Sequence, residues 1–173
     1  MMSPTDSMRS SMEDEMSWSR YDTDSGPGWI GWRNNGTVER LVLPGQPRPS
    51  TMAGTVPPQI ARIAEDLTRY FSGSGDLPGA RTFVDRAAAT EFETAVYGIV
   101  AGIPAGATMT YGEVAERAGR PGAARAVGAA MAKNRFAPMI PCHRVVGSDG
   151  SLRGYAGGLD MKRRLLAMEA TRA

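Results

Sequence analysis

The only cysteine and the only histidine of this 173-residue chain stand side by side, as Cys142 and His143. Pro138 and Pro141 precede them and favour an extended backbone, and Arg144 follows directly. A thiol attacks as its thiolate, and positive neighbours lower its pKa, so this setting predicts a reactive cysteine. The simpler alternative is a buried cysteine that packs as a small hydrophobic side chain.

Neighbouring residues of an extended chain point to opposite sides, so a direct contact between the Cys142 thiol and the His143 imidazole is unfavourable. A relay through a water is the more reasonable arrangement, and it needs a further group. Glu169 is a candidate because it falls towards the apolar face of a helix expected over residues 160–171, with Asp160 as its N-cap. A carboxylate on such a face is costly unless it is paired. The alternative is an ordinary glutamate at a helix end.

The composition limits the kinds of site and of location. One cysteine and one histidine exclude a disulfide framework and a zinc site built from three or four such residues. No apolar run approaches the roughly 18 residues of a membrane helix, and the N-terminus lacks the apolar stretch of a signal peptide. We therefore expect an intracellular protein without a metal and without a membrane partner.

Positive charge is concentrated in the second half of the chain. Residues 91–173 hold 11 Arg and Lys against 7 Asp and Glu, whereas residues 1–90 hold 9 Arg against 11 Asp and Glu. Between Arg117 and Arg164 there are ten basic residues and two acidic ones. Such a block favours an anionic partner, although a solvated basic face is the alternative.

The first half of the chain predicts a small α/β domain over residues 26–87. Residues 1–25 are rich in Ser, Met, Asp and Glu without an apolar period, which predicts a disordered tail. Two β-prone runs around an Asn-Asn-Gly turn at residues 34–36 predict a hairpin, and the spacing of apolar residues predicts a helix over 58–71. Residues 82–85 favour one more strand. The domain shows no catalytic constellation of its own.

The second domain, residues 88–173, is predicted to be mostly helical. Thr110 and Glu113 form a capping box that opens a short helix, and Pro121 is placed to begin the next one. Two short helices joined by a tight turn fit a helix-turn-helix pattern. The second of them is rich in alanine and glycine, which suits close packing against another helix. It equally suits a recognition helix in a DNA groove, with Arg125 as the long side chain that enters the groove.

Several segments of this second domain resemble one protein family. Residues 140–145, Ile-Pro-Cys-His-Arg-Val, are similar to the active-site signature of the methylated-DNA–protein-cysteine methyltransferases, also called O6-alkylguanine-DNA alkyltransferases. Residues 111–115 and 124–128 resemble the family's helix-turn-helix, Asn134 falls at its hinge position, and residues 154–159 resemble its substrate-pocket loop. The order of these segments along the chain and the spacing between them agree with the family's pattern over about residues 90–170.

The resemblance implies both a fold and a reaction. The fold is α+β, with a small ribonuclease-H-like sheet domain followed by a mostly helical domain that contains the helix-turn-helix. The reaction is DNA repair by irreversible transfer of an alkyl group from O6 of guanine, with O4 of alkylated thymine as a further substrate, to Cys142 after base flipping. A thioether is not hydrolysed by water and no second cysteine accepts the group, so each molecule acts once and needs no cofactor.

The same resemblance implies roles for individual residues. Catalytic roles fall to Cys142, to His143 and Glu169 as its proton relay, to Tyr111 as a donor to the base, and to Asn134 as the residue that orients the segment. The residues implied in contacts with DNA are Arg125, Tyr111, Arg120 and Ser148. Those implied in the wall of the substrate pocket are Tyr155, Gly157 and Val145.

The implied partner is double-stranded DNA bound through its minor groove by a cytoplasmic, nucleoid-associated monomer, with cooperative binding left open. Three alternatives remain. A lesion-binding protein without chemistry is kept open by Arg135, which stands where the family usually has proline. A methylation-sensing transcriptional regulator lacks the expected metal cysteines, and a thiol hydrolase is disfavoured because Cys142 and His143 are adjacent.

Overall fold

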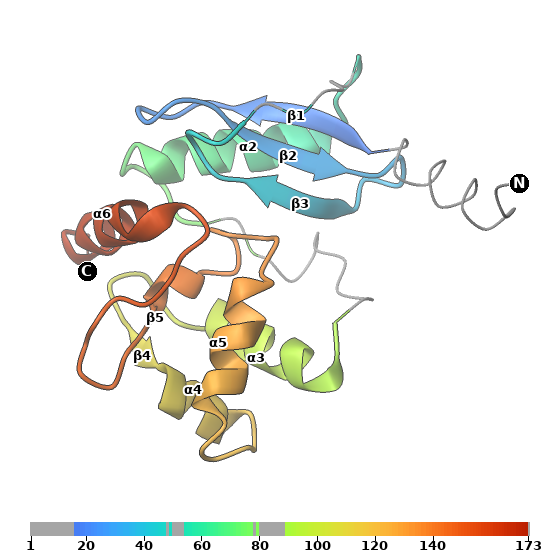
Figure 1. Cartoon of the computed structure of the whole chain (residues 1–173). Coiled ribbons are helices and arrows are strands. Elements are labelled where there is room, and N and C mark those ends of the chain that lie inside the picture. Colours follow the sequence, from blue (N-terminus) through green and yellow to red (C-terminus); the bar gives the residue numbers. More distant parts are fainter. Residues whose placement is uncertain (1–15, 48, 50–53, 78, 80–88, 173) are drawn as a thin grey trace, which may run out of the picture.

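An antiparallel sheet with one helix forms the N-terminal layer of the protein, and helices dominate the remainder (Figure 1). This computed structural model describes residues 16–47, 49, 54–77, 79 and 89–172. The fold is α+β, as the sequence predicts. None of the helices in these ranges is both long enough and apolar enough to cross a membrane.

Three strands build the N-terminal sheet in the order β1-β2-β3. They are β1 (Ser17–Tyr21), β2 (Gly28–Trp32) and β3 (Val38–Val42), and each neighbouring pair is antiparallel. The Asn-Asn-Gly turn joins β2 to β3, and Gly36 there adopts a left-handed φ of 81°, which glycine tolerates without strain. The predicted hairpin is confirmed.

Strand β1 shows that the prediction of a disordered tail over residues 1–25 was wrong for its last part. Its inward positions are Ser19 and Tyr21, so the strand has no apolar run that a sequence pattern would reveal. Tertiary contacts stabilise it instead: Trp32 Nε1 donates to Ser19 Oγ at 3.2 Å, and the Tyr21 hydroxyl donates to the Val42 carbonyl at 3.0 Å. Residues 1–15 and the strand predicted at 82–85 lie outside the described residues.

Helix α2 (Pro58–Phe71) packs on one face of this sheet and has the bounds predicted from its apolar spacing (Figure 1). Proline suits its first turn because the missing N–H would have no partner inside the helix. Its buried face carries Ile60, Ile63, Leu67, Tyr70 and Phe71. The end of α2 lies close to the C-terminal helix α6 (Gly158–Ala170) (Figure 1), where the Tyr70 hydroxyl reaches Glu169.

The C-terminal part contains α3 (Glu91–Ala101), α4 (Tyr111–Arg117), α5 (Ala124–Ala132) and α6. Two short parallel strands, β4 (Met109–Thr110) and β5 (Val145–Val146), connect the regions before α4 and after Cys142. A capping box opens α3, and the predicted box of Thr110 and Glu113 opens α4. Helices α4 and α5 pack against each other, and α6 lies between the N-terminal layer and these helices (Figure 1).

Two predicted helix starts were wrong. Pro121 does not begin α5, because Gly122 next to it has a left-handed φ of 82° and the turn continues until Ala124. Helix α6 begins at Gly158, so Asp160 lies in its first turn rather than at the N-cap. Asp160 pairs instead with Arg163, one turn further along the exposed side of α6.

Candidate active site

The segment of Cys142 is a single 3-10 turn, Cys142–Arg144, and not the extended chain that its prolines favour. The Arg144 N–H closes the turn on the Pro141 carbonyl at 2.9 Å. Because the chain turns here, the side chains of His143 and Arg144 both reach Glu169 of α6. The expectation of an extended chain is therefore wrong, but no direct hydrogen bond between the Cys142 thiol and the His143 imidazole forms among the described residues, so a relay through a water stays the more reasonable arrangement.

Glu169 is fully buried and accepts hydrogen bonds from three side chains. Arg144 donates twice, from Nε to Oε2 at 2.8 Å and from Nη2 to Oε1 at 2.7 Å. His143 Nε2 lies 3.0 Å from Oε1, and the Tyr70 hydroxyl donates to the same oxygen at 2.6 Å. Burial alone would raise the pKa of Glu169, but the bonds from His143, Arg144 and Tyr70 outweigh it and hold the pKa well below the ordinary value. Glu169 is therefore a carboxylate.

This carboxylate fixes the position of the proton on His143. An ionised carboxylate only accepts, so Nε2 carries the N–H and Nδ1 keeps its lone pair. Within the described part of the chain, no side chain or backbone group hydrogen-bonds the buried Nδ1. Burial lowers the pKa of His143 more than the pairing with Glu169 raises it, so the ring is neutral. Nδ1 is then a base that can take a proton.

Burial raises the pKa of Cys142, contrary to the expectation of a lowered value. The expected positive neighbours do not act on the thiol, because His143 is neutral and Arg144 is paired with Glu169. A hydrogen bond with Asn134 and the charge of Lys162 favour the thiolate, but burial outweighs both. The resting group is therefore a thiol, which must give up its proton before it can attack.

Asn134 is a buried side chain that braces the backbone before Cys142. Its Nδ2 donates to the Ile140 carbonyl at 2.9 Å, and its Oδ1 accepts from the Phe136 N–H at 2.9 Å. These two bonds close the loop between α5 and the cysteine turn. Asn134 thus holds the backbone that carries the thiol.

Cys142 borders a cavity of about 820 Å³ between α4, α5 and the loop that precedes α6. This volume lies in the range of small-molecule sites and is sufficient for a nucleobase. Burial raises the pKa of Tyr111 and that of Tyr155, so both hydroxyls stay protonated. The cavity brings together five of the residues predicted from the sequence, namely Cys142, Tyr111, Arg125, Ser148 and Tyr155.

Gly157 and Val145, which were expected in the pocket wall, do not line this cavity. Val145 is fully buried in β5. A Cβ added to Gly157 would lie 3.0 Å from a methyl carbon of Leu43 and 3.1 Å from Met161 Cγ, which is tighter than ordinary contact. Glycine at 157 therefore lets the start of α6 pack closely against the N-terminal layer.

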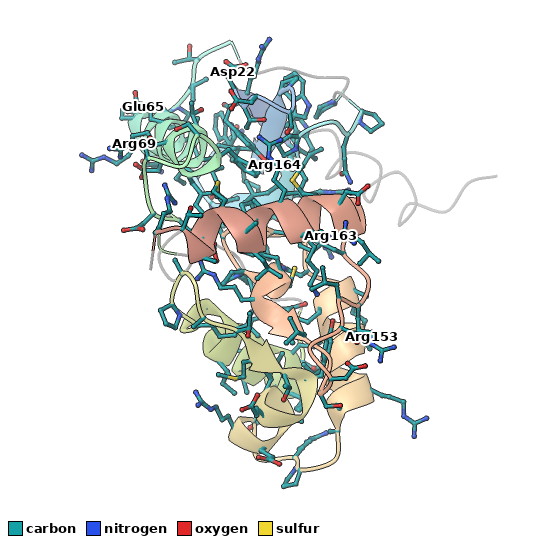
Figure 2. The ribbon with its side chains drawn as sticks, turned by 90° about the vertical axis from the view of Figure 1, so that its left-hand side faces the viewer. Asp22, Glu65, Arg69, Arg153, Arg163 and Arg164 are labelled. Atoms are coloured by element: carbon teal, nitrogen blue, oxygen red, sulfur yellow. The ribbon has the colours of Figure 1, made fainter. Side chains whose placement is uncertain are left out.

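The basic block divides into buried and exposed parts. Arg144 and Lys162 are buried, the first paired with Glu169 and the second bonded to two backbone carbonyls. Arg125 and Arg153 are exposed and border the cavity. Figure 2 shows Arg153 in the loop beside α6, and Arg163 and Arg164 on α6 itself. Arg120, expected at DNA, is exposed outside the cavity, with its guanidinium 5.0 Å from the centre of the Phe92 ring. Positive charge at the mouth of the cavity favours an anionic ligand.

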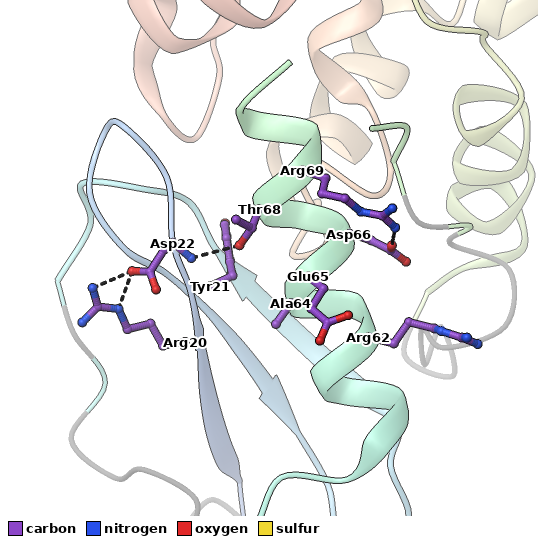
Figure 3. A pocket seen from close by; sticks show the side chains of 9 residues that line it. All are labelled: Arg20, Tyr21, Asp22, Arg62, Ala64, Glu65, Asp66, Thr68 and Arg69. Carbon is purple, nitrogen blue, oxygen red and sulfur yellow. Dashed lines mark hydrogen bonds and ion pairs between the residues drawn. The ribbon is translucent and has the colours of Figure 1, made fainter. Parts of the chain in front are cut away.

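A second cavity, of about 640 Å³, lies between β1 and α2 (Figure 3). On its rim Arg20 pairs with Asp22, and Arg69 pairs with Asp66 (Figure 3). None of the site residues predicted from the sequence lines it. Its charges largely neutralise one another, so it offers neither a nucleophile nor a field of one sign.

The C-terminal part matches a family model described as the DNA-binding domain of 6-O-methylguanine DNA methyltransferase, over residues 91–171. A methylated-DNA–protein-cysteine methyltransferase of Mycobacterium tuberculosis is 42% identical over 127 residues, which cover 73% of this chain and 70% of the relative. One of Methanothermobacter thermautotrophicus is 37% identical over 140 residues, 81% of this chain and 77% of the relative. The chain belongs to this methyltransferase family.

The likeness to solved methyltransferases includes the N-terminal layer. The crystal structure of the O6-methylguanine methyltransferase of Mycobacterium tuberculosis has a TM-score of 0.74 at 35% identity, over 91% of this chain and 94% of that chain. The OGT protein of the same organism, in a crystal structure with DNA, also gives a TM-score of 0.74 over these shares. The sequence resemblance had covered the N-terminal half only in general outline.

Two buried residues of this methyltransferase site escaped the sequence analysis. Tyr70 has the spacing of an ordinary core residue of α2, and no motif marks it. Lys162 had a signal, because it lies three and seven residues before Leu165 and Glu169 on the buried face of α6. Its Nζ donates to the carbonyls of Val145, at 2.7 Å, and Arg153, at 3.0 Å, and so ties α6 to the chain after Cys142.

Proposed function

We propose that the chain repairs alkylated DNA directly, as a methylated-DNA–protein-cysteine methyltransferase that transfers an alkyl group from O6 of guanine to Cys142. O4 of alkylated thymine is the second candidate substrate. The observation that carries the proposal is a thiol at the wall of a nucleobase-sized cavity, next to a neutral histidine whose proton a buried carboxylate fixes. The names of the relatives support the same reaction.

The proposed step is one in-line displacement. Cys142 Sγ forms a bond to the alkyl carbon while the bond from that carbon to O6 breaks, and the electron pair stays on guanine. The thiol proton passes through a water to Nδ1 of His143, and the charge that develops on the ring is stabilised by Glu169 at Nε2. Because Arg144 holds Glu169 as a carboxylate, we assign the proton to His143 rather than to Glu169. Tyr111 donates a hydrogen bond to the departing guanine anion. The anion takes up one proton from water, and His143 gives up the thiol proton to water, so the net change moves one proton from the thiol to guanine.

The product is a thioether, which water does not hydrolyse. The chain has no second cysteine to accept the alkyl group. Each molecule should therefore act once, with no cofactor needed for the displacement.

We infer that α4 and α5 act as a helix-turn-helix, with α5 in the minor groove of duplex DNA. In support, the exposed positions of α5 other than Arg125 are all alanine, so the backbone can approach DNA closely. The target base must leave the stack to reach Cys142, and Arg125, at the cavity mouth, is placed to fill the space it leaves. Ser148 lines the same cavity and would contact the flanking phosphate, with Arg120 further out.

Other features of the proposal rest on the resemblance. We expect the N-terminal layer to be related to the ribonuclease-H fold, with a domain boundary near residue 87. We also expect a monomer, cytoplasmic and associated with the nucleoid, whose cooperativity on DNA a titration would measure. Tyr155, which lines the cavity, would close the pocket over the base.

Arg125→Ala is expected to slow repair of duplex DNA about tenfold or more, since loss of an arginine contact to DNA costs roughly 1–3 kcal/mol. Reaction with the free alkylated base should change little, because no duplex has to be opened. Single-turnover rates on both substrates measure the difference. Arg117→Ala, an exposed arginine of α4 that does not line the cavity, is the matched control. Equal losses on duplex and free base would show that Arg125 does not fill the vacated space.

The function itself is tested by the mass of the intact protein after incubation with a duplex that carries one O6-methylguanine. We expect a gain of one methyl group, located by peptide mapping on the Cys142 peptide, that saturates at one per chain. An unchanged mass with the lesion strand still bound would instead identify a lesion-binding protein without chemistry.

A further inference from the structure

Tyr70 is the point at which the N-terminal layer reaches the relay of His143 and Glu169. It lies near the end of α2, and 1% of its surface is exposed. Its hydroxyl oxygen is 2.6 Å from Glu169 Oε1 and 3.2 Å from His143 Nε2. Three polar atoms from α2, α6 and the cysteine turn therefore meet within hydrogen-bond distance.

The protons of this cluster can be assigned from its partners. Arg144 keeps Glu169 ionised, so the single proton of the Tyr70 hydroxyl is donated to Oε1. The Nε2–H of His143 then faces two acceptors, the carboxylate oxygen and the lone pairs of the tyrosine oxygen. Tyr70 thus binds both members of the relay, each through a different part of one hydroxyl.

Packing alone does not explain the hydroxyl. The Tyr70 ring makes an edge contact with Phe71, with ring centroids 5.4 Å apart, which a phenylalanine would keep. A buried hydroxyl costs free energy unless it is hydrogen-bonded, so an apolar ring would be the simpler core residue. Burial and the bond to Glu169 raise the pKa of Tyr70 far above its ordinary value, although Arg144 and Arg172 lower it. The hydroxyl is therefore a permanent donor.

We propose that Tyr70 is a positioning residue of the transfer reaction, whose hydroxyl holds Glu169 and the His143 ring so that Nδ1 stays the free basic nitrogen. This inference rests on the proposed function for its effect on rate, but its effect on His143 is independent of activity. It assigns the N-terminal layer a part in the chemistry, although that layer contributes no atom that reacts.

The test compares Tyr70→Phe with the wild-type chain and with Tyr21→Phe. Tyr21 is the matched control, since it is a buried tyrosine of the same layer whose hydroxyl donates to a backbone carbonyl, that of Val42. The Tyr70→Phe variant should transfer methyl from an O6-methylguanine duplex about ten- to a hundredfold more slowly than the wild type. General acid–base catalysis contributes roughly 10²–10⁴-fold, so this loss lies at or below the low end of that range. Its affinity for the duplex should stay unchanged, and Tyr21→Phe should transfer at the wild-type rate.

A second readout uses the fact that the chain has one histidine, so ¹⁵N-labelled imidazole reports on His143 alone. In the wild type and in Tyr21→Phe, NMR should show the tautomer protonated at Nε2. In Tyr70→Phe the ring loses one of the two groups that fix it, and both nitrogen shifts should move towards averaged values. The melting temperature of each variant shows whether it is folded at the temperature of the comparison.

The possible outcomes separate the two proposals. A Tyr70→Phe chain with the wild-type rate and the wild-type tautomer overturns the role of Tyr70. A lowered rate with an unchanged tautomer also overturns it, because the loss would then be merely structural. If the wild type transfers no methyl group while the tautomer shifts as expected, the proposed function fails and the positioning of His143 stands.

Discussion

Cys142→Ala is expected to lose methyl transfer completely while the variant still binds a duplex that carries O6-methylguanine. The reason is that Cys142 is the only thiol of the chain, so no other side chain can form the thioether. The cavity, the exposed Arg125 and the outer face of α5 do not depend on the sulfur. Intact mass and the methyl content of the DNA measure transfer, and fluorescence anisotropy of a labelled duplex measures binding.

Cys142→Ser separates the chemistry from the packing in the same experiment. Serine nearly keeps the volume of the buried thiol and its hydrogen-bonding capacity towards Asn134. A serine hydroxyl has a far higher pKa than a thiol, so this variant should also transfer nothing. Methyl transfer by either variant would contradict the proposal that Cys142 is the acceptor. Loss of DNA binding in both would show that the thiol is needed for the shape of the site.

The helices and turns that short sequence patterns specify were predicted correctly from the sequence. An Asn-Asn-Gly turn, the apolar spacing of α2 and the Thr110–Glu113 capping box each act within a few residues, so the chain around them matters little. Gly122 shows the limit of the same approach. A proline suited to a helix start was offset by the left-handed glycine beside it, and only the fold shows which residue decides.

The chemistry of the site depended more on tertiary structure. Cys142 was identified from its neighbours, but the shift of its pKa was predicted with the wrong sign. Arg144 pairs with Glu169 of α6 instead of acting on the thiol, and burial of the thiol dominates. Likewise, Tyr70 joins Glu169 across 99 positions of sequence, and no local pattern encodes such a contact. Strand β1 is held by contacts of the same long-range kind.

Glu169→Gln is expected to weaken both the fold and the reaction. Replacing the carboxylate leaves the buried Arg144 guanidinium without its counter-charge, and breaking a buried pair in this way costs roughly 3–5 kcal/mol. The imidazolium that forms at His143 during transfer loses its stabilising partner as well. Urea unfolding should therefore show a large loss, and single-turnover transfer should slow at least about tenfold with nearly unchanged DNA affinity.

Glu93→Gln is the matched control. Glu93 also pairs with a basic residue, Lys133, but that lysine is largely exposed. Glu93 is itself buried, but glutamine keeps the capping box with Thr90, and Lys133 stays solvated when the pair is lost. The control should therefore lose less stability than Glu169→Gln, because no buried guanidinium is left without its counter-charge, and it should keep the wild-type transfer rate. A comparable loss in both variants would mean that removing any carboxylate destabilises this protein.

The dependence of stability on pH gives the sharper test of Glu169. Its pKa in the folded protein lies well below the value of about 4.3 in an unfolded chain, so its contribution is present above pH 4.3 and is lost as the pH falls towards the folded value. The wild type should lose stability steeply below about pH 5, and Glu169→Gln should show a shallower slope over the same range. If the two curves run parallel, the carboxylate is not held ionised by Arg144 and His143. The bonds from Arg144 and His143 would then not stabilise the charge of Glu169, and the argument that this carboxylate fixes the proton on Nε2 of His143 would lose its support.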